Sequence, residues 1–369
     1  MKVAIIETVH YQYGLTLSAI FKEADKVFFV TRDIHDSMHA YDASSCVGEF
    51  IIIPDVEEAA DLITRTCRQH GVDLLLISPI FKDFTGLYKV VSQLECTKVL
   101  TTHNINFWFR SRFRTWKYYK ERKLKQAIAR RCDYIAVEDF LYEHVTRHDR
   151  KLGNQFKFIY IPFTLFKPGR EIRFHRQDHS RLQVVLPGSI HWERRRYETV
   201  LEVIRNFARQ KAPITFSFAG KAIGDYGLHV VRELDKANDT WPGIARFYPP
   251  NEPATPEMFL HEMETSDLVL STSTTRFRAL GTTEHIGSTK PTGAIQDMNS
   301  FQLPGLLPAH LSVPRNLAGS VFNYTSASDL RDRLQQLLDH PDTLRQWKER
   351  ARENSNNFTA EKIREQLPF

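Results

Sequence analysis

Short apolar runs alternate with amphipathic stretches along the first half of the chain. The apolar runs have the length of buried strands and lie at Val3–Ile6, Lys26–Val30, Leu74–Ile77, Lys98–Thr102, Tyr134–Val137 and Phe158–Ile161. Between them, stretches such as Glu57–His70 and Thr115–Arg130 place apolar residues at helical spacing. Strands that alternate with helices predict a mostly parallel sheet covered by helices on both faces.

Polar residues follow several of these expected strands directly. They are Glu7-Thr8, Ser78-Pro79, His103-Asn104 and Glu138-Asp139. In open α/β sheets, ligands bind beyond the carboxyl ends of the strands. These strand ends are therefore expected to face a binding site.

The alternation starts again after Phe166–Ser180, a polar and basic stretch with a Pro-Gly pair that is typical of a linker. The expected elements are strands at Gln183–Leu186, Ile214–Ala219, Ile244–Tyr248 and Leu268–Ser271, and helices at Arg196–Gln210, Tyr226–Asn238, Pro256–Thr265, Thr292–Phe301, Ala327–Leu338 and Asp342–Leu367. We therefore predict an α/β protein with two Rossmann-like domains that face each other across a cleft. The predicted ranges are 1–166 and 181–345 for the domains, 167–180 for the linker, and 346–369 for a C-terminal helix that returns to the first domain.

The segment Gly281–Pro308 has the pattern of an anion site. After a strand, a loop with Gly, Ser, Thr and Lys leads into a helix start at Pro291–Ala294, and a further strand is expected near Leu303–Leu307. Free backbone N–H groups and the helix dipole favour negative charge at such a helix start, and Lys290 adds a full positive charge. The pattern predicts a site for a phosphorylated ligand.

Composition limits the class of protein. At 369 residues, with 42% hydrophobic and 25% charged residues, the chain is long enough for two globular domains. No apolar stretch approaches the roughly 18 residues of a membrane span, and the N-terminal apolar run is too short for a signal peptide. The four cysteines lie far apart without a C-x-x-C pair, which argues against a zinc site or disulfides and favours a cytoplasmic protein.

The positive charge is concentrated in one segment. Arg110–Arg131 contains ten Lys or Arg and one Glu, whereas the whole chain carries only +6, so the remaining residues sum to −3. Apolar residues approximate one helical stripe within the segment; they are Phe109, Phe113, Trp116, Leu124 and Ile128. One interpretation is a helix that lies on an anionic inner membrane surface. The other is a core-packed helix with a solvated basic face; nucleic acid is disfavoured because no recognised binding motif accompanies the patch.

The order of these features resembles the GT-B glycosyltransferases, in particular the retaining family-4-type (group 1) enzymes, over nearly the whole chain. The matching segments are Thr101–Asn104, Cys132–Glu138, Phe158–Pro162, Val185–Ile190 with Glu193–Tyr197, Thr215–Gly220, and Asp267–Ser271 with the loop and helix that follow. The sequence departs from the family's two glutamates separated by seven residues. Asp297 stands at the second position and Thr289 at the first, and Ser189 stands where an arginine is common.

The resemblance implies a site for a nucleotide-diphosphate sugar as donor substrate, with no separate cofactor and no metal. Asp297 would hold the ribose hydroxyls, and Glu284 would contact the sugar hydroxyls. The diphosphate would be bound by Lys290, Arg194 and Arg195 and by the helix start at Thr292, Gly293 and Ala294.

Further residues of this expected site lie at other strand ends. His103 would lie near the donor sugar or the leaving phosphate, and Gly188 would allow a tight turn that places Ser189 near the ligand. The loop after the first strand, with Glu7, His10 and Tyr13, would line the acceptor side.

The resemblance thus implies a cytoplasmic glycosyltransferase, with or without attachment to the inner membrane face. It would move a sugar with retention to a saccharide or lipid-linked saccharide in surface polysaccharide or glycoconjugate synthesis. Two alternatives stay open. One is a nucleotide-sugar epimerase on the same fold, and the other is a non-catalytic nucleotide- or sugar-binding member of a polysaccharide assembly complex.

Overall fold

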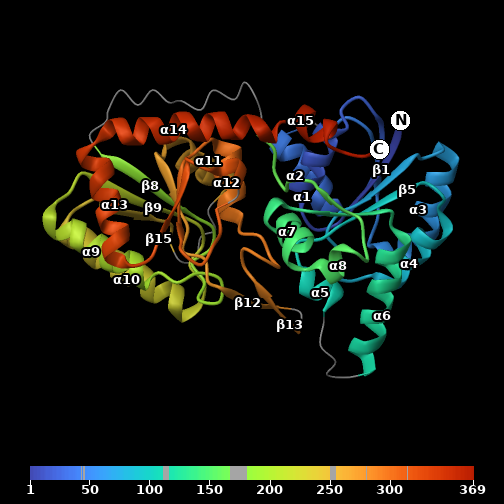
Figure 1. Cartoon of the computed structure of the whole chain (residues 1–369), viewed down its shortest axis with the longest axis horizontal. Coiled ribbons are helices and arrows are strands. Elements are labelled where there is room, and N and C mark those ends of the chain that lie inside the picture. Colours follow the sequence, from blue (N-terminus) through green and yellow to red (C-terminus); the bar gives the residue numbers. More distant parts are fainter. Residues whose placement is uncertain are drawn as a thin grey trace. The chain divides into compact units, whose positions relative to one another are not determined.

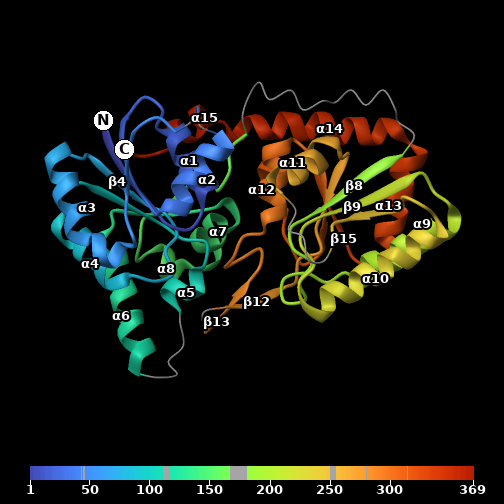
Figure 2. The same cartoon turned by 180° about the vertical axis from the view of Figure 1, so that it is seen from behind.

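The chain forms two compact α/β units in a computed structural model. The structure describes residues 1–42, 44, 46–110, 116–166, 181–249, 255–279, 281–313 and 315–369. Unit 1 comprises Met1–Leu165, Arg278–Pro291 and Ala360–Phe369, and unit 2 comprises Phe166–Phe277 and Thr292–Thr359. The predicted linker 167–180 lies outside the described residues. Figure 1 and Figure 2 show the elements of both units from opposite sides.

Unit 1 is built on a parallel sheet of seven strands in the order β3-β2-β1-β4-β5-β6-β7. The strands are β1 Lys2–Glu7, β2 Asp25–Val30, β3 Glu49–Ile52, β4 Leu74–Ile77, β5 Thr97–Thr101, β6 Tyr134–Val137 and β7 Phe158–Tyr160. Alternate residues of β1 enter two different cores, since Ala4 and Ile6 pack on one face and Val3 and Ile5 on the other. Burial on both faces explains why these strands read as unbroken apolar runs.

Helices cover both faces of this sheet. They are α1 Tyr11–Ile20, α2 Arg32–Asp42, α3 Val56–His70, α4 Phe84–Gln93, α5 Ile105–Phe109, α6 Trp116–Arg131, α7 Asp139–Glu143, α8 Arg150–Gly153 and α15 Ala360–Glu365. Local signals set their ends. At α3, the Asp55 side chain accepts the N–H of Glu58, and Gly71 ends the helix in the left-handed conformation.

Unit 2 has a second parallel sheet, with six strands in the order β10-β9-β8-β11-β14-β15. Its strands are β8 Leu182–Pro187, β9 Ile214–Ala219, β10 Ala245–Phe247, β11 Leu268–Leu270, β14 Gly305–Pro308 and β15 Val321–Tyr324. Its helices are α9 Glu198–Gln210, α10 Gly224–Thr240, α11 Pro256–Thr265, α12 Gly293–Phe301, α13 Ala327–Asp339 and α14 Pro341–Ser355. Two parallel sheets, each with crossover helices, confirm the predicted α/β class of two Rossmann-like domains.

The segment between β11 and α12 differs from the expected loop. It forms a β-hairpin of β12, Arg276–Ala279, and β13, Thr282–His285. Residues 278–291 group with unit 1, whereas the sequence-based ranges placed them in the second domain. These residues group with unit 1 because β13 contacts α5. Contacts between segments so far apart cannot be predicted from a local sequence pattern.

The C-terminal region is two helices and not one. α14 belongs to unit 2, and residues 360–369, which contain α15, belong to unit 1. α15 packs against α1, and Ile363 is fully buried there. No helix among the described residues is long and apolar enough to span a bilayer.

Candidate functional site

The carboxyl edge of the unit 1 sheet gathers polar side chains from adjacent strands. β1, β4, β5 and β6 are neighbours and run parallel, so the residues that follow them lie along one edge. These residues include Glu7, Ser78, His103 and Glu138, and all four are buried. The edge therefore brings together polar side chains from strands that are far apart in the sequence, because neighbouring parallel strands end on the same side of the sheet.

His103 and Glu138 form a histidine–carboxylate pair at this edge. Thr102 N–H donates to the Ala136 carbonyl at 3.0 Å, which holds the ends of β5 and β6 together. The Nδ1 atom of His103 lies 3.2 Å from Oε1 of Glu138. The two side chains are only 8% and 12% exposed, so water competes little for this contact.

The loop after β1 presents a second histidine. Oε1 of Glu7 accepts the N–H groups of Val9 and His10 at 2.8 and 2.7 Å, which fixes the turn into α1. Burial raises the pKa of Glu7 to about 7, although these two N–H groups favour its ionised form. Burial, with the nearby His103 and Lys290, lowers the pKa of His10 to about 3, so this imidazole is neutral at physiological pH.

Aromatic rings enclose the two histidines. The ring of Phe163 lies 5.0 Å from that of His103 and 5.3 Å from that of His10, and the two histidine rings lie 5.1 Å apart. Tyr13 stacks on Phe163, and its hydroxyl lies 3.0 Å from Oγ1 of Thr101. Tyr13 is fully buried, so it packs beneath the histidine and phenylalanine rings and does not line an open surface.

Lys290 reaches this edge of unit 1 from the segment after β13. Its Nζ donates to Oδ1 of Asn104 at 2.9 Å, and the Thr289 carbonyl accepts the N–H of Ile105 at 3.0 Å. Lys290 is thus bonded to Asn104, the residue that follows His103 in the chain. A cation beside a histidine–carboxylate pair favours an anionic or strongly polar ligand.

The Glu284 side chain, which was predicted to contact sugar hydroxyls, is bonded to backbone N–H groups of α5. Its carboxylate accepts the backbone N–H of Phe107 at 2.8 Å and of Asn106 at 3.2 Å, so it caps the start of α5. The side chain is only 2% exposed, and burial raises its pKa. The structure therefore gives Glu284 a structural role that fastens the hairpin to α5.

In unit 2, the carboxyl end of β8 forms a tight turn against an arginine. Gly188 has φ +86°, and a Cβ at this position would lie 2.3 Å from Nη2 of Arg195. Nη1 of Arg195 donates to the Ser189 carbonyl at 3.0 Å. Gly220, after β9, packs on the Gly188 backbone, and a Cβ there would lie 2.3 Å away. Glycine is required at both positions, and together they place a guanidinium at the strand end.

The neighbouring arginine points to a different partner. The Arg194 guanidinium lies over the ring of Phe277 at 4.9 Å from its centroid, and the side chain is exposed. Its backbone carbonyl accepts the N–H of Thr274 at 3.0 Å. Of the two predicted cations, Arg195 is the one held against the Gly188 turn.

The start of α12 is tied to β11 by hydroxyl groups. Oγ of Ser273 lies 3.0 Å from Oγ of Ser271 and 2.9 Å from Oγ1 of Thr292, the residue that precedes the helix. A Cβ on Gly293 would meet no atom within 4 Å, so the first turn of α12 faces open space next to Ala294. Unpaired N–H groups of such a turn are donors for an anion.

Asp297 lies one turn further along α12 and is half-buried. Burial raises its pKa to about 7, and the positive charge of Arg195 acts in the opposite direction.

The predicted site residues thus fall into two groups. His103, Glu284 and Lys290 belong to unit 1, whereas the others belong to unit 2: Gly188, Ser189, Arg194, Arg195, Thr292, Gly293, Ala294 and Asp297. Sequence reasoning missed the hydroxyl chain through Ser271 and Ser273. It named Glu138 as a strand-end residue but not its contact with His103, because residues 35 positions apart are paired only by strand order.

The basic segment packs differently from the predicted stripe. Phe109 belongs to α5, and both it and Ile128 lie in the unit 1 core, with Leu124 packed against them. The predicted Phe113 and the side chain of Trp116 lie outside the described residues. Among the α6 side chains that the structure describes, those of residues 119–131, the exposed ones are cations, namely Lys120, Lys123, Arg130 and Arg131.

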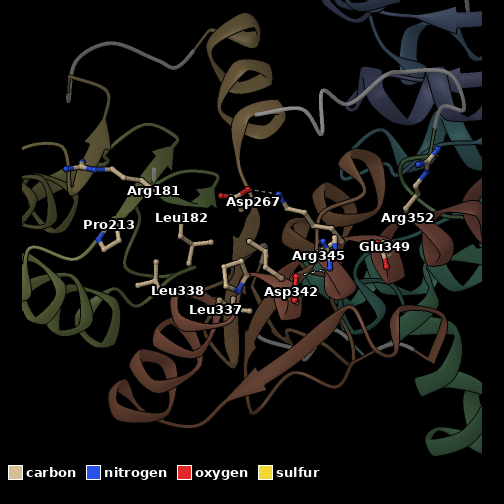
Figure 3. Close-up of a pocket in the computed structure, with 13 residues that line it drawn as sticks. Arg181, Leu182, Pro213, Asp267, Leu337, Leu338, Asp342, Arg345, Glu349 and Arg352 are labelled. Carbon is tan, nitrogen blue, oxygen red and sulfur yellow. Dashed lines mark hydrogen bonds and ion pairs between the residues drawn. The ribbon is translucent and has the colours of Figure 1, made fainter. Parts of the chain in front are cut away.

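A cavity of about 600 Å³ lies at the opposite, amino end of the unit 2 sheet (Figure 3). Leucines from β8, α13 and α14 form its apolar surface; they are Leu182, Leu337, Leu338 and Leu344. Its charged groups largely pair with one another, since Lys348 donates to Asp267 at 2.5 Å and Arg345 lies 2.8 Å from Asp342. None of the predicted site residues lines it.

No protein-family model and no curated protein matches the sequence. Solved structures with the same fold do match over almost the whole chain. Sucrose-phosphate synthase from Thermosynechococcus elongatus has a TM-score of 0.60 at 13% identity, covering 99% of this chain and 97% of its own. Anabaena HepE in complex with UDP has a TM-score of 0.60 at 13% identity, covering 99% and 98%.

An epimerase shares the fold to a similar degree. UDP-GlcNAc 2-epimerase from Neisseria meningitidis bound to UDP-GlcNAc has a TM-score of 0.56 at 13% identity, covering 99% of this chain and 98% of its own. At this level of identity the similarity shows the fold, which is that of the GT-B glycosyltransferases and of these epimerases.

Proposed function

We propose that this protein is a glycosyltransferase that moves a sugar from a nucleotide-diphosphate sugar to a saccharide or lipid-linked saccharide, in the synthesis of a surface polysaccharide or glycoconjugate. The observation that carries the proposal is the Gly188 turn with Arg195 packed against it at the carboxyl end of β8. A guanidinium has five N–H donors, and only one is used by the Ser189 carbonyl. The GT-B fold, found in proteins solved with UDP and UDP-GlcNAc, supports a nucleotide-sugar ligand.

In this proposal unit 2 binds the nucleotide diphosphate. Arg195 and the first-turn N–H groups of Gly293 and Ala294 would hold phosphate oxygens, with Arg194 adding positive charge. Asp297 would accept hydrogen bonds from the ribose hydroxyls in its ionised form. These donors would stabilise the charge that develops on the leaving diphosphate, in place of a metal.

The same proposal gives unit 1 the groups that act on the sugars. Lys290 would add positive charge near the leaving phosphate, and His103 would contact a sugar hydroxyl. The family that the sequence resembles transfers with retention, in which case the leaving phosphate itself would accept the proton of the acceptor hydroxyl.

Thermal unfolding with UDP, GDP, dTDP and CMP, and with their sugars, tests the nucleotide site. We expect one nucleotide to raise the midpoint of unfolding. Arg195→Ala should weaken its binding by about 2 kcal/mol, or roughly 30-fold, because a charged hydrogen bond to phosphate is lost. Arg205→Ala is the matched control, since Arg205 also lies in unit 2 but pairs with Glu233 on the exposed side of α9. Stabilisation by no nucleotide would refute the site.

We further propose that the protein works in the cytoplasm on the inner membrane face, where α6 would meet a lipid-linked acceptor. The exposed cations among the described residues 119–131 lie on one side of the helix, within about 100° of one another. Because Phe109 and Ile128 are buried, the attraction would be electrostatic and would weaken with salt.

Sedimentation with anionic vesicles tests this surface. Lys123→Glu with Arg130→Glu should weaken binding by at least about 2 kcal/mol, or roughly 30-fold. The control is Arg209→Glu with Arg232→Glu, which changes charge equally on exposed positions of unit 2. Equal binding by both double variants would rule out α6 as the membrane contact.

The second candidate function is a nucleotide-sugar epimerase. It is favoured by the buried Glu7, whose pKa of about 7 suits proton transfer at neutral pH, and by the UDP-GlcNAc 2-epimerases among proteins of the same fold. Incubation with the nucleotide sugar alone separates the two. An epimerase changes the sugar while it stays on the nucleotide, whereas a transferase releases the nucleotide only when an acceptor is added. Binding without either reaction would indicate a non-catalytic module.

A further inference from the structure

We propose that the indole ring of Trp192 is a stacking surface for the pyranose ring of a saccharide. The inference rests on the transferase function proposed above, to which it adds a sugar contact beside the nucleotide site of unit 2. Trp192 lies on the turn after β8, three residues before Arg195, and is 50% exposed. The other tryptophans whose side chains the structure describes are buried or partly buried; they are Trp108, Trp241 and Trp347. Trp192 therefore offers a large aromatic surface that a ligand can cover.

Hydrogen bonds hold the turn that carries Trp192. The His191 carbonyl accepts the N–H of Arg195 at 3.0 Å, which closes the turn. The carbonyl of Glu193, the residue after Trp192, accepts the hydroxyl of Thr274 at 3.1 Å, which ties the turn to the segment after β11. The indole is thus presented by a fixed backbone, so little conformational entropy is lost when a ligand covers it.

A guanidinium accompanies the exposed indole. The Arg196 guanidinium lies over the Trp192 ring, 5.5 Å from its centroid. The face of an indole carries partial negative charge, which attracts a cation and also the C–H groups of a sugar ring, because these carry partial positive charge. Arg196 is itself exposed, so its N–H groups can donate to sugar hydroxyls beside the ring. An apolar face next to hydrogen-bond donors matches a pyranose, which has C–H groups on its faces and hydroxyls around its edge.

The turn runs along the carboxyl edge of the unit 2 sheet, from the loop after β9 to the segment after β11. At its first end, Ile190 pairs with Ala222, which follows β9. At its other end, Arg195 pairs with Ser273, which follows β11. Trp192 lies between these two pairs, next to Arg195 and towards β9. Ligands of open α/β sheets bind at this edge.

This order places Trp192 on the sugar side of the proposed nucleotide site. The start of α12 lies at the β11 end of the turn, because the Thr292 hydroxyl is 2.9 Å from that of Ser273. In the proposed binding mode, phosphate contacts Arg195 and the ribose contacts Asp297 on α12, so the nucleoside occupies the α12 side. The group on the other side of the diphosphate is the sugar, and an acceptor must approach the same end. Trp192 is thus expected to contact a sugar ring of the donor or of the acceptor, and not the base.

The indole N–H signals of ¹⁵N-labelled protein test this contact without turnover. The signal of Trp192 is identified by its loss in Trp192→Phe. If the ring belongs to the donor, UDP-GlcNAc or GDP-mannose should shift this signal, whereas UDP or GDP alone should leave it nearly unchanged. If the ring belongs to the acceptor, the shift should appear only when maltotriose or chitotriose is added to the protein bound to UDP or GDP. A shift of equal size with the nucleotide alone would overturn the inference, because it would place the base on the indole.

Calorimetric titration with the saccharide that shifts the signal measures what the ring contributes. Trp192→Ala should weaken its binding roughly 10-fold, whereas Trp192→Phe, which keeps an aromatic face, should weaken it by less than about 3-fold. The affinity for the nucleotide alone should be unchanged in both variants. Leu228→Ala is the control, because Leu228 is an exposed apolar residue further along the same side of the chain, on α10 of unit 2.

The outcomes separate this inference from the function on which it rests. Nucleotide binding with no saccharide effect on the Trp192 signal, or with equal saccharide affinity in Trp192→Ala and the wild type, would overturn the stacking surface and leave the nucleotide site intact. Binding of no nucleotide at all would overturn the proposed function and the inference together. Because the Trp192 side chain is exposed, the midpoint of thermal unfolding should be the same in the wild type and in the variants.

Discussion

At the scale of single residues, each unit contains a carboxylic acid whose pKa is shifted towards neutral pH by its surroundings. Glu7 in unit 1 and Asp297 in unit 2 have pKa values raised to about 7 by burial. Groups with shifted pKa values occur often at functional sites. Burying an ionisable group also costs stability, because the charged form loses its hydration. That cost leads to a direct prediction for Glu7.

Glu7→Gln should make the protein more resistant to unfolding at pH 8 than the wild type. The folded-state pKa of Glu7 is raised from 4.5 to about 7, so the folded protein binds this proton more tightly than the unfolded chain does. Stability from this group is therefore fully present below pH 4.5 and is lost as pH rises through 7. The shift corresponds to about 3 kcal/mol at pH 8, which the neutral glutamine avoids while keeping an acceptor for the N–H of His10.

Thermal unfolding at pH 5 and pH 8 measures this effect. The midpoint of Glu7→Gln should exceed that of the wild type at pH 8. The difference should be much smaller at pH 5, where Glu7 is protonated in the folded protein and less than about 1 kcal/mol of the cost remains. Glu23→Gln is the control, because Glu23 is an exposed carboxylate in the same unit. Glu57 is less suitable, because its side chain accepts the N–H of Gly86. An equal advantage at both pH values would contradict the assigned cause.

Also at this scale, the sequence indicated which residues end the strands but not which of them touch. His103 and Glu138 could both be named, because each follows an apolar run directly. Their contact depends on β5 and β6 being neighbours in the sheet, which is a property of the order of strands. The capping of α5 by Glu284 has the same origin, since it joins positions 177 and 178 residues apart.

At the scale of elements, the strands of the sheet centres were predictable and the hairpin was not. A strand buried on both faces is an uninterrupted apolar run, as at Leu74–Ile77. By contrast, β12 and β13 have the sequences RFRA and TTEH, which contain few apolar residues. Their conformation depends on contacts with α5, so a local pattern reads them as loop.

These contacts predict that Glu284 fastens the hairpin to unit 1. Glu284→Ala removes both acceptors for the N–H groups of Asn106 and Phe107, which are left unpaired in a buried place. We expect a loss of about 1–3 kcal/mol in the stability of unit 1. Amide exchange should rise in α5 and in residues 282–290 together.

The neighbouring Thr283→Ala is the matched control, because the Thr283 side chain is exposed on the same strand. Glu284→Gln should fall between the two, since the amide keeps one acceptor oxygen. Faster exchange confined to α5, with the hairpin unchanged, would show that Glu284 caps the helix without fastening β13.

At the scale of the whole molecule, the repeated alternation of strands and helices was enough to predict two Rossmann-like units. What it did not predict was the grouping of residues 278–291 with unit 1. For the C-terminus it predicted that residues 346–369 return to the first domain, and in the structure residues 360–369 belong to unit 1. Grouping of this kind depends on tertiary packing alone. The second segment offers a test, because α15 is short and its buried side chains are few.

Ile363→Ala should destabilise unit 1 and leave unit 2 unchanged. Ile363 is fully buried in a core that it shares with Leu17, Ile20 and Phe21, so its truncation should cost about 2–5 kcal/mol. Amide exchange should accelerate in α1 and α15, with no change in α9 and α10. Glu365→Ala, an exposed change in the same helix, should have no effect. If exchange accelerated equally in α9 and α10, the two units would unfold as one cooperative body, and the C-terminal segment would stabilise the molecule as a whole and not unit 1 in particular.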